Sequence, residues 1–153
     1  MKIRVFWLGK TRDSWIKQGI DEYSGRVARY LPLVIDELKD EKDASQDEGR
    51  KREGERLLKQ IQPQTLLVVL DERGEQMSSV KLSEFIGKQR DAGIQEIAFA
   101  IGGAYGFSDD VRSRANKVLA LSSMTFTHQM IRPFLLEQIY RAFTILNKEP
   151  YHH

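Results

Sequence analysis

The feature of this sequence that most constrains its fold is a fivefold alternation of short apolar runs with longer amphipathic segments. The strand-like runs cover residues 2–8, 33–38, 65–70, 96–101 and 118–121. Apolar residues spaced three and four apart predict helices over 14–31, 79–90 and 133–147, with a charged helix over 45–61 and a short one starting at 108. Strands that alternate with helices are typical of an α/β fold, so we predict a mostly parallel sheet flanked by helices.

The composition narrows the class of protein further. With 153 residues, of which 41% are hydrophobic and 30% charged, we expect one globular domain over 1–153. The absence of cysteine excludes disulfides, thiolate zinc sites and a cysteine nucleophile. The longest apolar run, Leu66–Leu70, is far shorter than a membrane span, and the N-terminal segment has no signal-peptide pattern. We therefore expect a soluble cytoplasmic protein with no membrane partner.

The charge balance is close to neutral and does not by itself predict a nucleic-acid partner. The chain has 24 basic and 22 acidic residues, a formal net charge of +2. Neither half is a basic tail, although a sum of charges does not resolve a local basic patch.

Glycine and polar residues follow three consecutive predicted strands. Asp71–Gly74 follow the third strand, Gly102–Gly106 the fourth and Ser122–His128 the fifth. Because ligands bind beyond the carboxyl ends of the strands in an open α/β sheet, these segments predict a ligand site. The glycine spacing, G-G-x-x-G, is neither the dinucleotide fingerprint nor a P-loop. Two interpretations remain open for it, a plain tight turn or a close backbone approach to a ligand.

The polar residues that could carry other chemistry form weaker patterns. The chain has three histidines, His128, His152 and His153, and no H-E-x-x-H motif, so we expect no metal site. A serine triad could use Ser122 or Ser123 with His128 and Asp71, but no G-x-S-x-G motif supports it. The two terminal histidines could also be the remnant of an expression tag.

Cations and aromatic residues are interleaved near the C-terminus. Arg132, Arg141 and Lys148 lie on or beside the last predicted helix, close in sequence to Tyr140 and Tyr151. Such a mixture suits contacts with RNA phosphates and stacking on bases. A solvated helix face is the alternative interpretation, and spacing alone favours it.

Several of these segments occur together in one known family. They are Leu70-Asp71, Ile101-Gly102-Gly103, Leu121-Ser122-Ser123-Met124-Thr125-Phe126 with His128, Glu137-x-x-Tyr140-Arg141-Ala142 and the terminal Pro150-Tyr151-His152. In this order and over essentially the whole chain, the sequence resembles the RlmH-type (YbeA-like) branch of the SPOUT methyltransferases. That family methylates N3 of a pseudouridine in bacterial large-subunit rRNA. The chain departs from the family pattern at Thr127, where proline is frequent, and at His153, where a basic residue is frequent. We expect the first departure to loosen one loop.

The resemblance implies a fold, a cofactor and partners. It implies a small α/β domain with a C-terminal trefoil knot that binds S-adenosylmethionine, a homodimer, and large-subunit rRNA of the assembled ribosome as substrate. The residues expected to bind the cofactor are Leu70, Gly102, Gly103, Leu121, Ser122, Ser123, Met124, Thr125 and Phe126. Histidine titrates near neutral pH, so His152 is the expected proton acceptor. Tyr151 is expected to stack on the target base and Arg141 to hold a phosphate.

The last helix and the residues after it carry two further expectations. The helix has six large apolar residues, more than one face usually buries in a monomer, which predicts a dimer interface. These residues are Phe134, Leu135, Ile139, Tyr140, Phe143 and Leu146. The tail from Tyr151 onward lies beyond the helix, so its deletion should cost little stability.

Two alternative functions stay open at this point. One is an RNA- or ribosome-binding module without catalysis, and the other is a nucleotide-binding α/β hydrolase or transferase that holds phosphate with its glycine loop. Binding of S-adenosylhomocysteine would favour the methyltransferase over both.

Overall fold

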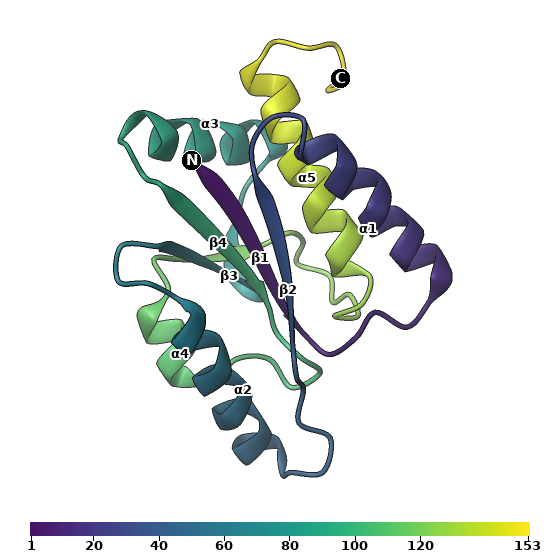
Figure 1. The fold of residues 1–153 in the computed structure, drawn as a ribbon, viewed down its shortest axis with the longest axis vertical. Coiled ribbons are helices and arrows are strands. Elements are labelled where there is room, and N and C mark those ends of the chain that lie inside the picture. Colours follow the sequence, from purple (N-terminus) through teal and green to yellow (C-terminus); the bar gives the residue numbers. More distant parts are fainter.

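The computed structural model describes residues 1–153 and shows a parallel sheet between two helical layers (Figure 1). The strands are β1 (Lys2–Leu8), β2 (Leu33–Leu38), β3 (Leu66–Gln76), β4 (Glu96–Ile101) and β5 (Lys117–Ala120). The helices are α1 (Ser14–Val27), α2 (Gln46–Gln60), α3 (Ser79–Asp91), α4 (Asp109–Arg114) and α5 (Ile131–Leu146). Their order confirms the predicted alternation. None of the helices combines the length and apolar character needed to span a bilayer.

The sheet has the strand order β2-β1-β4-β3-β5, and every neighbouring pair is parallel. The prediction of an α/β fold with a mostly parallel sheet is therefore confirmed. The order makes β4, β3 and β5 neighbours, so the three segments that follow these strands meet at one edge. The candidate functional site lies where these three segments meet.

The two faces of the sheet bury different residues because side chains alternate along a strand. On β1, Ile3, Val5 and Trp7 pack in a large core with α1, α3 and α5, whereas Phe6 packs in a smaller core with α2 and α4. Helices α1 and α5 lie side by side over the first face, and α2 and α4 over the other (Figure 1). Both faces are covered, which explains why the first five residues of β3, Leu66–Leu70, and most of β4 are continuous apolar runs.

Serine side chains cap the starts of three of the five helices, α2, α3 and α4. The hydroxyls of Ser45 and Ser108 accept hydrogen bonds from the backbone N–H groups of Glu48 and Val111, as expected for N-caps. Helix α1 ends at Val27, four residues before the predicted end. The N–H groups of Arg29 and Tyr30 donate to the carbonyls of Arg26 and Val27, three residues back, so the helix tightens into a turn before Pro32.

Strand β3 is longer than predicted and includes the segment expected to follow it. Leu119 of β5 pairs with both Leu70 and Glu75, so Asp71–Gly74 lie in a register shift inside the strand. A Cβ at Gly74 would lie 2.7 Å from the carbonyl oxygen of Val118. Glycine is thus required there by the close approach of the two strands, which no local pattern reveals.

The apolar surplus of α5 is mostly used inside the subunit. Helix α5 contacts both α1 and α3, and Leu135, Ile139 and Phe143 are buried in the large core. Of the six apolar residues predicted to form a dimer interface, only Phe134 is exposed, at 40% of its surface. The surplus on this helix therefore does not by itself indicate a second copy, because two neighbouring helices cover it.

Candidate functional site

The three predicted segments converge on one large cavity at the carboxyl ends of β3, β4 and β5. The cavity has a volume of about 1230 Å³. Its lining includes eight of the nine predicted cofactor residues, namely Leu70, Gly102, Gly103, Leu121, Ser122, Met124, Thr125 and Phe126. The ninth, Ser123, is exposed and does not line the cavity. The juxtaposition of the three strand ends follows from the strand order.

The glycine loop, defined as Gly102–Gly106, is both a tight turn and a wall of this cavity. The N–H of Gly106 donates to the carbonyl of Gly103 at 3.1 Å, and Gly106 has φ +79°, a conformation that favours glycine. A Cβ at Gly102 would lie 3.3 Å from the backbone of Gly106, and a Cβ at Gly103 would lie 3.0 Å from Oε1 of Glu53. Packing against the protein therefore explains both glycines and confirms the tight turn, and the close approach of the backbone to a ligand stays a prediction.

Apolar side chains form part of the cavity walls, and charged and polar side chains form much of the rest. Leu70, Ile101, Leu119 and Leu121 come from the ends of the strands, and the loop backbone supplies polar groups beside them. A pocket with apolar walls and a few backbone polar groups is typical of a small-molecule site.

Arginines at the rim of the cavity hold Asp71. Its carboxylate accepts from the backbone N–H of Arg73 at 2.8 Å and pairs with Arg112 at 2.5 Å. Burial would raise the pKa of Asp71, but the bonds from Arg73 and the charge of Arg112 outweigh it, so the pKa is lowered. Asp71 is thus bound to arginines and not to His128, which argues against the serine triad.

The segment after β5 is held by its own hydroxyl groups. The N–H of Met124 donates to Oγ of Ser122 at 3.0 Å, and Oγ1 of Thr125 donates to the carboxylate of Glu72. Oγ1 of Thr127 accepts from the N–H of Met130 at 3.1 Å, at the start of α5. The Thr127 hydroxyl ties this loop to the start of the helix, a bond that a proline side chain could not accept, and the loosening of the loop stays a prediction.

Arg132 is buried, which contradicts both interpretations made from the sequence. Its guanidinium donates to the carbonyl of Leu8 and to Oγ1 of Thr11, both at 2.9 Å, and lies 4.9 Å from the ring centre of Trp7. Burial lowers the pKa of Arg132 to about 10. Arg132 is therefore neither a phosphate contact nor part of a solvated face; it fastens α5 to the end of β1.

His128 lines the cavity, and Arg132 and Arg12 are the arginines whose charges act on it. Burial lowers the pKa of its imidazole, and the charges of Arg132 and Arg12 lower it further. His128 is consequently neutral at physiological pH.

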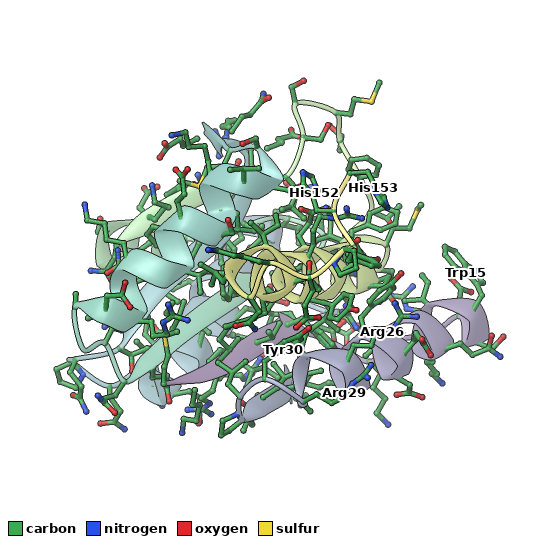
Figure 2. The ribbon with its side chains drawn as sticks, turned by 90° about the horizontal axis from the view of Figure 1, so that it is seen from above. Trp15, Arg26, Arg29, Tyr30, His152 and His153 are labelled. Carbon is green, nitrogen blue, oxygen red and sulfur yellow. The ribbon has the colours of Figure 1, made fainter.

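A second cavity of about 770 Å³ adjoins the first and contains two of the predicted catalytic residues. Tyr151 and Arg141 line it, and Leu121, Ser122 and Phe126 belong to the walls of both cavities. Trp15 also lines both; it protrudes from the first turn of α1 with 56% of its surface exposed (Figure 2).

Glu137 organises the predicted catalytic residues. Its Oε1 accepts from Nε of Arg141 and from the phenol of Tyr151, both at 3.0 Å. The Tyr151 ring packs edge-on against Tyr140 at 4.7 Å. Nη1 of Arg141 lies 3.1 Å from Nδ1 of His152, on the tail shown in Figure 2. The structure thus brings the three predicted residues together.

The protonation states of this cluster limit its chemistry. Burial raises the pKa of the Tyr151 phenol, and its hydrogen bond to Glu137 raises it further, so the phenol stays protonated. A guanidinium only donates, so Nδ1 of His152 is the acceptor in its contact with Arg141. While this contact holds, Nδ1 is occupied.

Sequence reasoning did not assign a site role to Glu137, Trp15 or Glu53. The i,i+4 spacing of Glu137 and Arg141 on a predicted helix was an available signal. Nothing local marks Trp15 or Glu53, since their significance comes from segments distant in sequence. The structure contains no group of three histidine, cysteine or carboxylate side chains that could hold a metal ion.

Known proteins resemble this chain over its full length. The protein "Ribosomal RNA large subunit methyltransferase H" of Trichlorobacter lovleyi is 76% identical over 153 residues, and its namesake from Geotalea uraniireducens is 62% identical; both alignments cover 100% of each chain. A solved structure of a probable methylase family protein from Haemophilus influenzae Rd KW20 superposes with a TM-score of 0.56 at 11% identity. It covers 99% of this chain and 70% of that one, and it supports the fold alone.

A family model described as "Predicted SPOUT methyltransferase" matches residues 1–152. This match spans the whole cavity region and the C-terminal cluster, and it agrees with the resemblance read from the sequence. The chain therefore belongs to the SPOUT methyltransferase family.

Proposed function

We propose that this protein transfers a methyl group from S-adenosylmethionine to N3 of a pseudouridine in bacterial large-subunit rRNA. The single observation that carries the proposal is the convergence of three strand-end segments on one cavity, next to the cluster of Arg141, Tyr151 and His152. The relatives that match the whole chain are named as large-subunit rRNA methyltransferases, which supports the choice of substrate.

The first cavity suits the cofactor in size and chemistry. Leu70 and Leu121 offer apolar walls for an adenine, and the backbone of Gly102, Gly103 and Ser122–Phe126 offers hydrogen-bonding groups. S-adenosylmethionine, when bound, supplies an electrophilic methyl group and leaves as a neutral thioether. The protein's contribution is then mainly to hold donor and acceptor in line.

The second cavity is proposed to receive the target base. It shares Leu121, Ser122 and Phe126 with the first, so a base held there lies beside the cofactor. Tyr151 offers an aromatic face for stacking. Arg141 is proposed to bind an RNA phosphate.

The reacting nitrogen carries a proton that must leave as the bond to carbon forms. We assign its acceptance to His152. An RNA phosphate that binds Arg141 would replace the contact with Nδ1 of His152, and this ring nitrogen would then accept the proton. Binding of the RNA would thereby free His152 to act as the proton acceptor.

The assembled form is also part of the proposal. We propose a homodimer that includes the exposed aromatic cluster of Trp15, Phe126 and Phe134, in which the last two rings pack edge to face at 5.6 Å. The C-terminal trefoil knot implied by the resemblance belongs to the same proposal, as does a cytoplasmic location. Because the net charge is only +2, we propose that the protein's affinity for the ribosome comes more from complementary shape than from attraction between its net charge and the rRNA phosphates.

Methylation of ribosomes from a strain that lacks the modification tests the proposal. Nucleoside mass spectrometry of the rRNA should show one added N3-methylpseudouridine, and calorimetry should show binding of S-adenosylhomocysteine. Binding of rRNA without cofactor binding would support a non-catalytic RNA-binding module. Preference for a phosphorylated nucleotide would support a nucleotide-binding transferase.

A further inference from the structure

Helix α2 packs against the glycine loop and the start of α4 through three residues close in sequence. Nη1 of Arg50 donates to the carbonyl of Tyr105 at 3.3 Å. A Cβ at Gly54 would lie 2.6 Å from Oγ of Ser108, so the helix and the second residue after the loop are in close contact. Between them Glu53 faces the middle of the loop. Arg50 and the loop both line the large cavity, whereas Glu53 and Gly54 do not line it.

Glu53 is a carboxylate in an unusual place. Only 6% of its surface is exposed, and it does not line the cavity. Its Oε2 accepts from the backbone N–H of Glu41 at 2.9 Å, and its Oε1 faces Gly103, 3.0 Å from the position of a Cβ there. Burial raises the pKa of this carboxyl, which reflects the cost of keeping a charge there. A hydrophobic residue would avoid this cost, but it would not accept the bond from Glu41.

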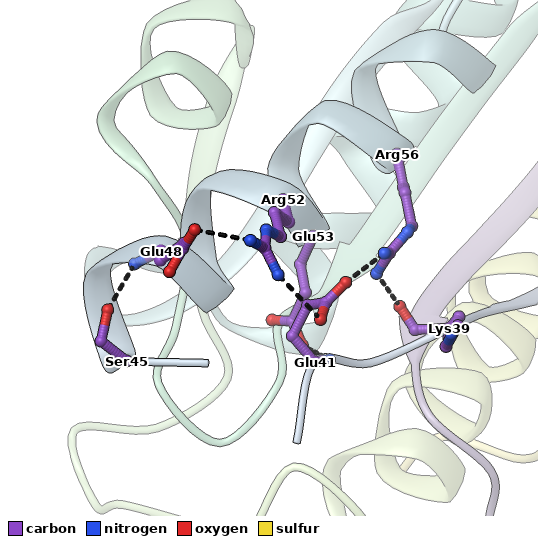
Figure 3. Close-up of polar contacts among 7 residues, drawn as sticks. All are labelled: Lys39, Glu41, Ser45, Glu48, Arg52, Glu53 and Arg56. Atoms are coloured by element: carbon purple, nitrogen blue, oxygen red, sulfur yellow. Dashed lines mark hydrogen bonds and ion pairs between the residues drawn. The ribbon is translucent and has the colours of Figure 1, made fainter. Parts of the chain in front are cut away.

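On the other side of Glu53 lies a cluster of polar contacts among Lys39, Glu41, Arg52 and Arg56, called the clamp below (Figure 3). The side chain of Glu41 pairs with Arg52 at 3.7 Å and also bonds to Arg56, and Arg56 donates to the carbonyl of Lys39 at 2.9 Å. These bonds fix the connection between β2 and α2 against the helix. Because the N–H that Glu53 accepts belongs to this connection, one end of its carboxylate has a fixed position.

We propose that Glu53 is a positioning residue that sets the conformation of the glycine loop for cofactor binding. One carboxylate oxygen is fixed by Glu41, and the other is in contact with Gly103, so the side chain acts as a spacer between the clamp and the loop. The proposal rests on the proposed function, in which the loop binds S-adenosylmethionine. Since Glu53 does not reach the cavity, its removal should raise the KM for the cofactor and leave kcat at saturation almost unchanged.

The first test compares Glu53→Ala with Glu55→Ala, an exposed residue on the same helix. Calorimetry with S-adenosylhomocysteine should show affinity reduced roughly tenfold in Glu53→Ala, within the range for residues in contact, and unchanged in Glu55→Ala. Hydrogen exchange of cofactor-free protein should quicken at 103–107 only in Glu53→Ala. Glu53→Gln, which keeps an acceptor oxygen, should restore both. If Glu53→Ala does not fold, Glu53→Asp, shorter by one methylene, replaces it.

A double-mutant cycle tests the contact itself. Gly103→Ala should weaken S-adenosylhomocysteine binding roughly tenfold in wild type, because its methyl group meets the carboxylate of Glu53. In the Glu53→Ala background the same change should cost less than about threefold. Equal costs in both backgrounds, or wild-type affinity and exchange in folded Glu53→Ala, would overturn the proposal. Failure of wild type to bind the ligand at all would instead overturn the proposed function.

Discussion

Removal of Tyr151–His153 separates the stabilising and catalytic contributions of the C-terminal tail. From the sequence, the tail is expected to add little stability. The structure changes this expectation, because the Tyr151 ring packs on Tyr140 at 4.7 Å, lies 4.6 Å from the guanidinium of Arg141, and its phenol donates to Glu137 at 3.0 Å. His152 is exposed and makes one contact, with Arg141.

The expected loss of stability comes mostly from Tyr151. An edge-to-face aromatic pair contributes about 1 kcal/mol, and a hydrogen bond to a carboxylate roughly 1.5 kcal/mol when partly exposed. The free energy of unfolding should therefore fall by about 2–3 kcal/mol. For a chain of this length, that loss lowers Tm by roughly 4–12 °C. His152→Ala removes none of these contacts and should leave Tm near the wild-type value.

Calorimetric unfolding and methylation of unmodified ribosomes measure the two contributions. We expect both variants to bind S-adenosylhomocysteine, and we expect methylation to fall by about 10²–10⁴-fold in the truncated protein, as for a lost acid–base group. His152→Ala should reproduce part of that loss and His153→Ala much less. A truncated protein with the wild-type Tm would refute the packing argument. Wild-type methylation by His152→Ala would refute the role of the imidazole.

Further predictions concern the core, the loop and the surface. Arg132→Met should lower the free energy of unfolding by about 3 kcal/mol, measured by urea denaturation, because it leaves a buried carbonyl and hydroxyl without donors; an unchanged midpoint would contradict this. Gly103→Val should keep the circular dichroism spectrum and weaken S-adenosylhomocysteine binding, and unchanged affinity would remove the loop from the site. Phe134→Glu should shift sedimentation from dimer toward monomer, whereas monomeric wild type would refute the proposed dimer. The raised pKa of Glu53 means that its contribution to stability is present below pH 4.5 and is lost as pH rises through the folded-state pKa. Glu53→Gln should therefore be at least as heat-stable as wild type at pH 8, with the difference shrinking toward pH 4.

Local sequence patterns determined the elements of this fold. Alternation and short apolar runs placed the five strands, three-to-four spacings placed α1, α3 and α5, and the serines at 45 and 108 marked the starts of α2 and α4. These signals work because side-chain direction along a strand or helix repeats with a fixed period, and because an N-cap bonds to a group three residues away. Because ligands bind beyond the carboxyl ends of strands in an open α/β sheet, the polar and glycine residues after three strands also predicted a ligand site.

Only the tertiary structure decided which distant residues meet. The strand order places β3 between β4 and β5, and the approach of β5 extends β3 through Asp71–Gly74. The positions of α1 and α3 bury the apolar surplus of α5, and the end of β1 buries Arg132. Contacts between distant segments, such as the bond from Arg132 to Leu8 across 124 residues, have no period in the sequence, because they depend on how whole elements pack. For the same reason Glu53, an unremarkable position in a charged helix, becomes the support of the glycine loop only in the folded chain.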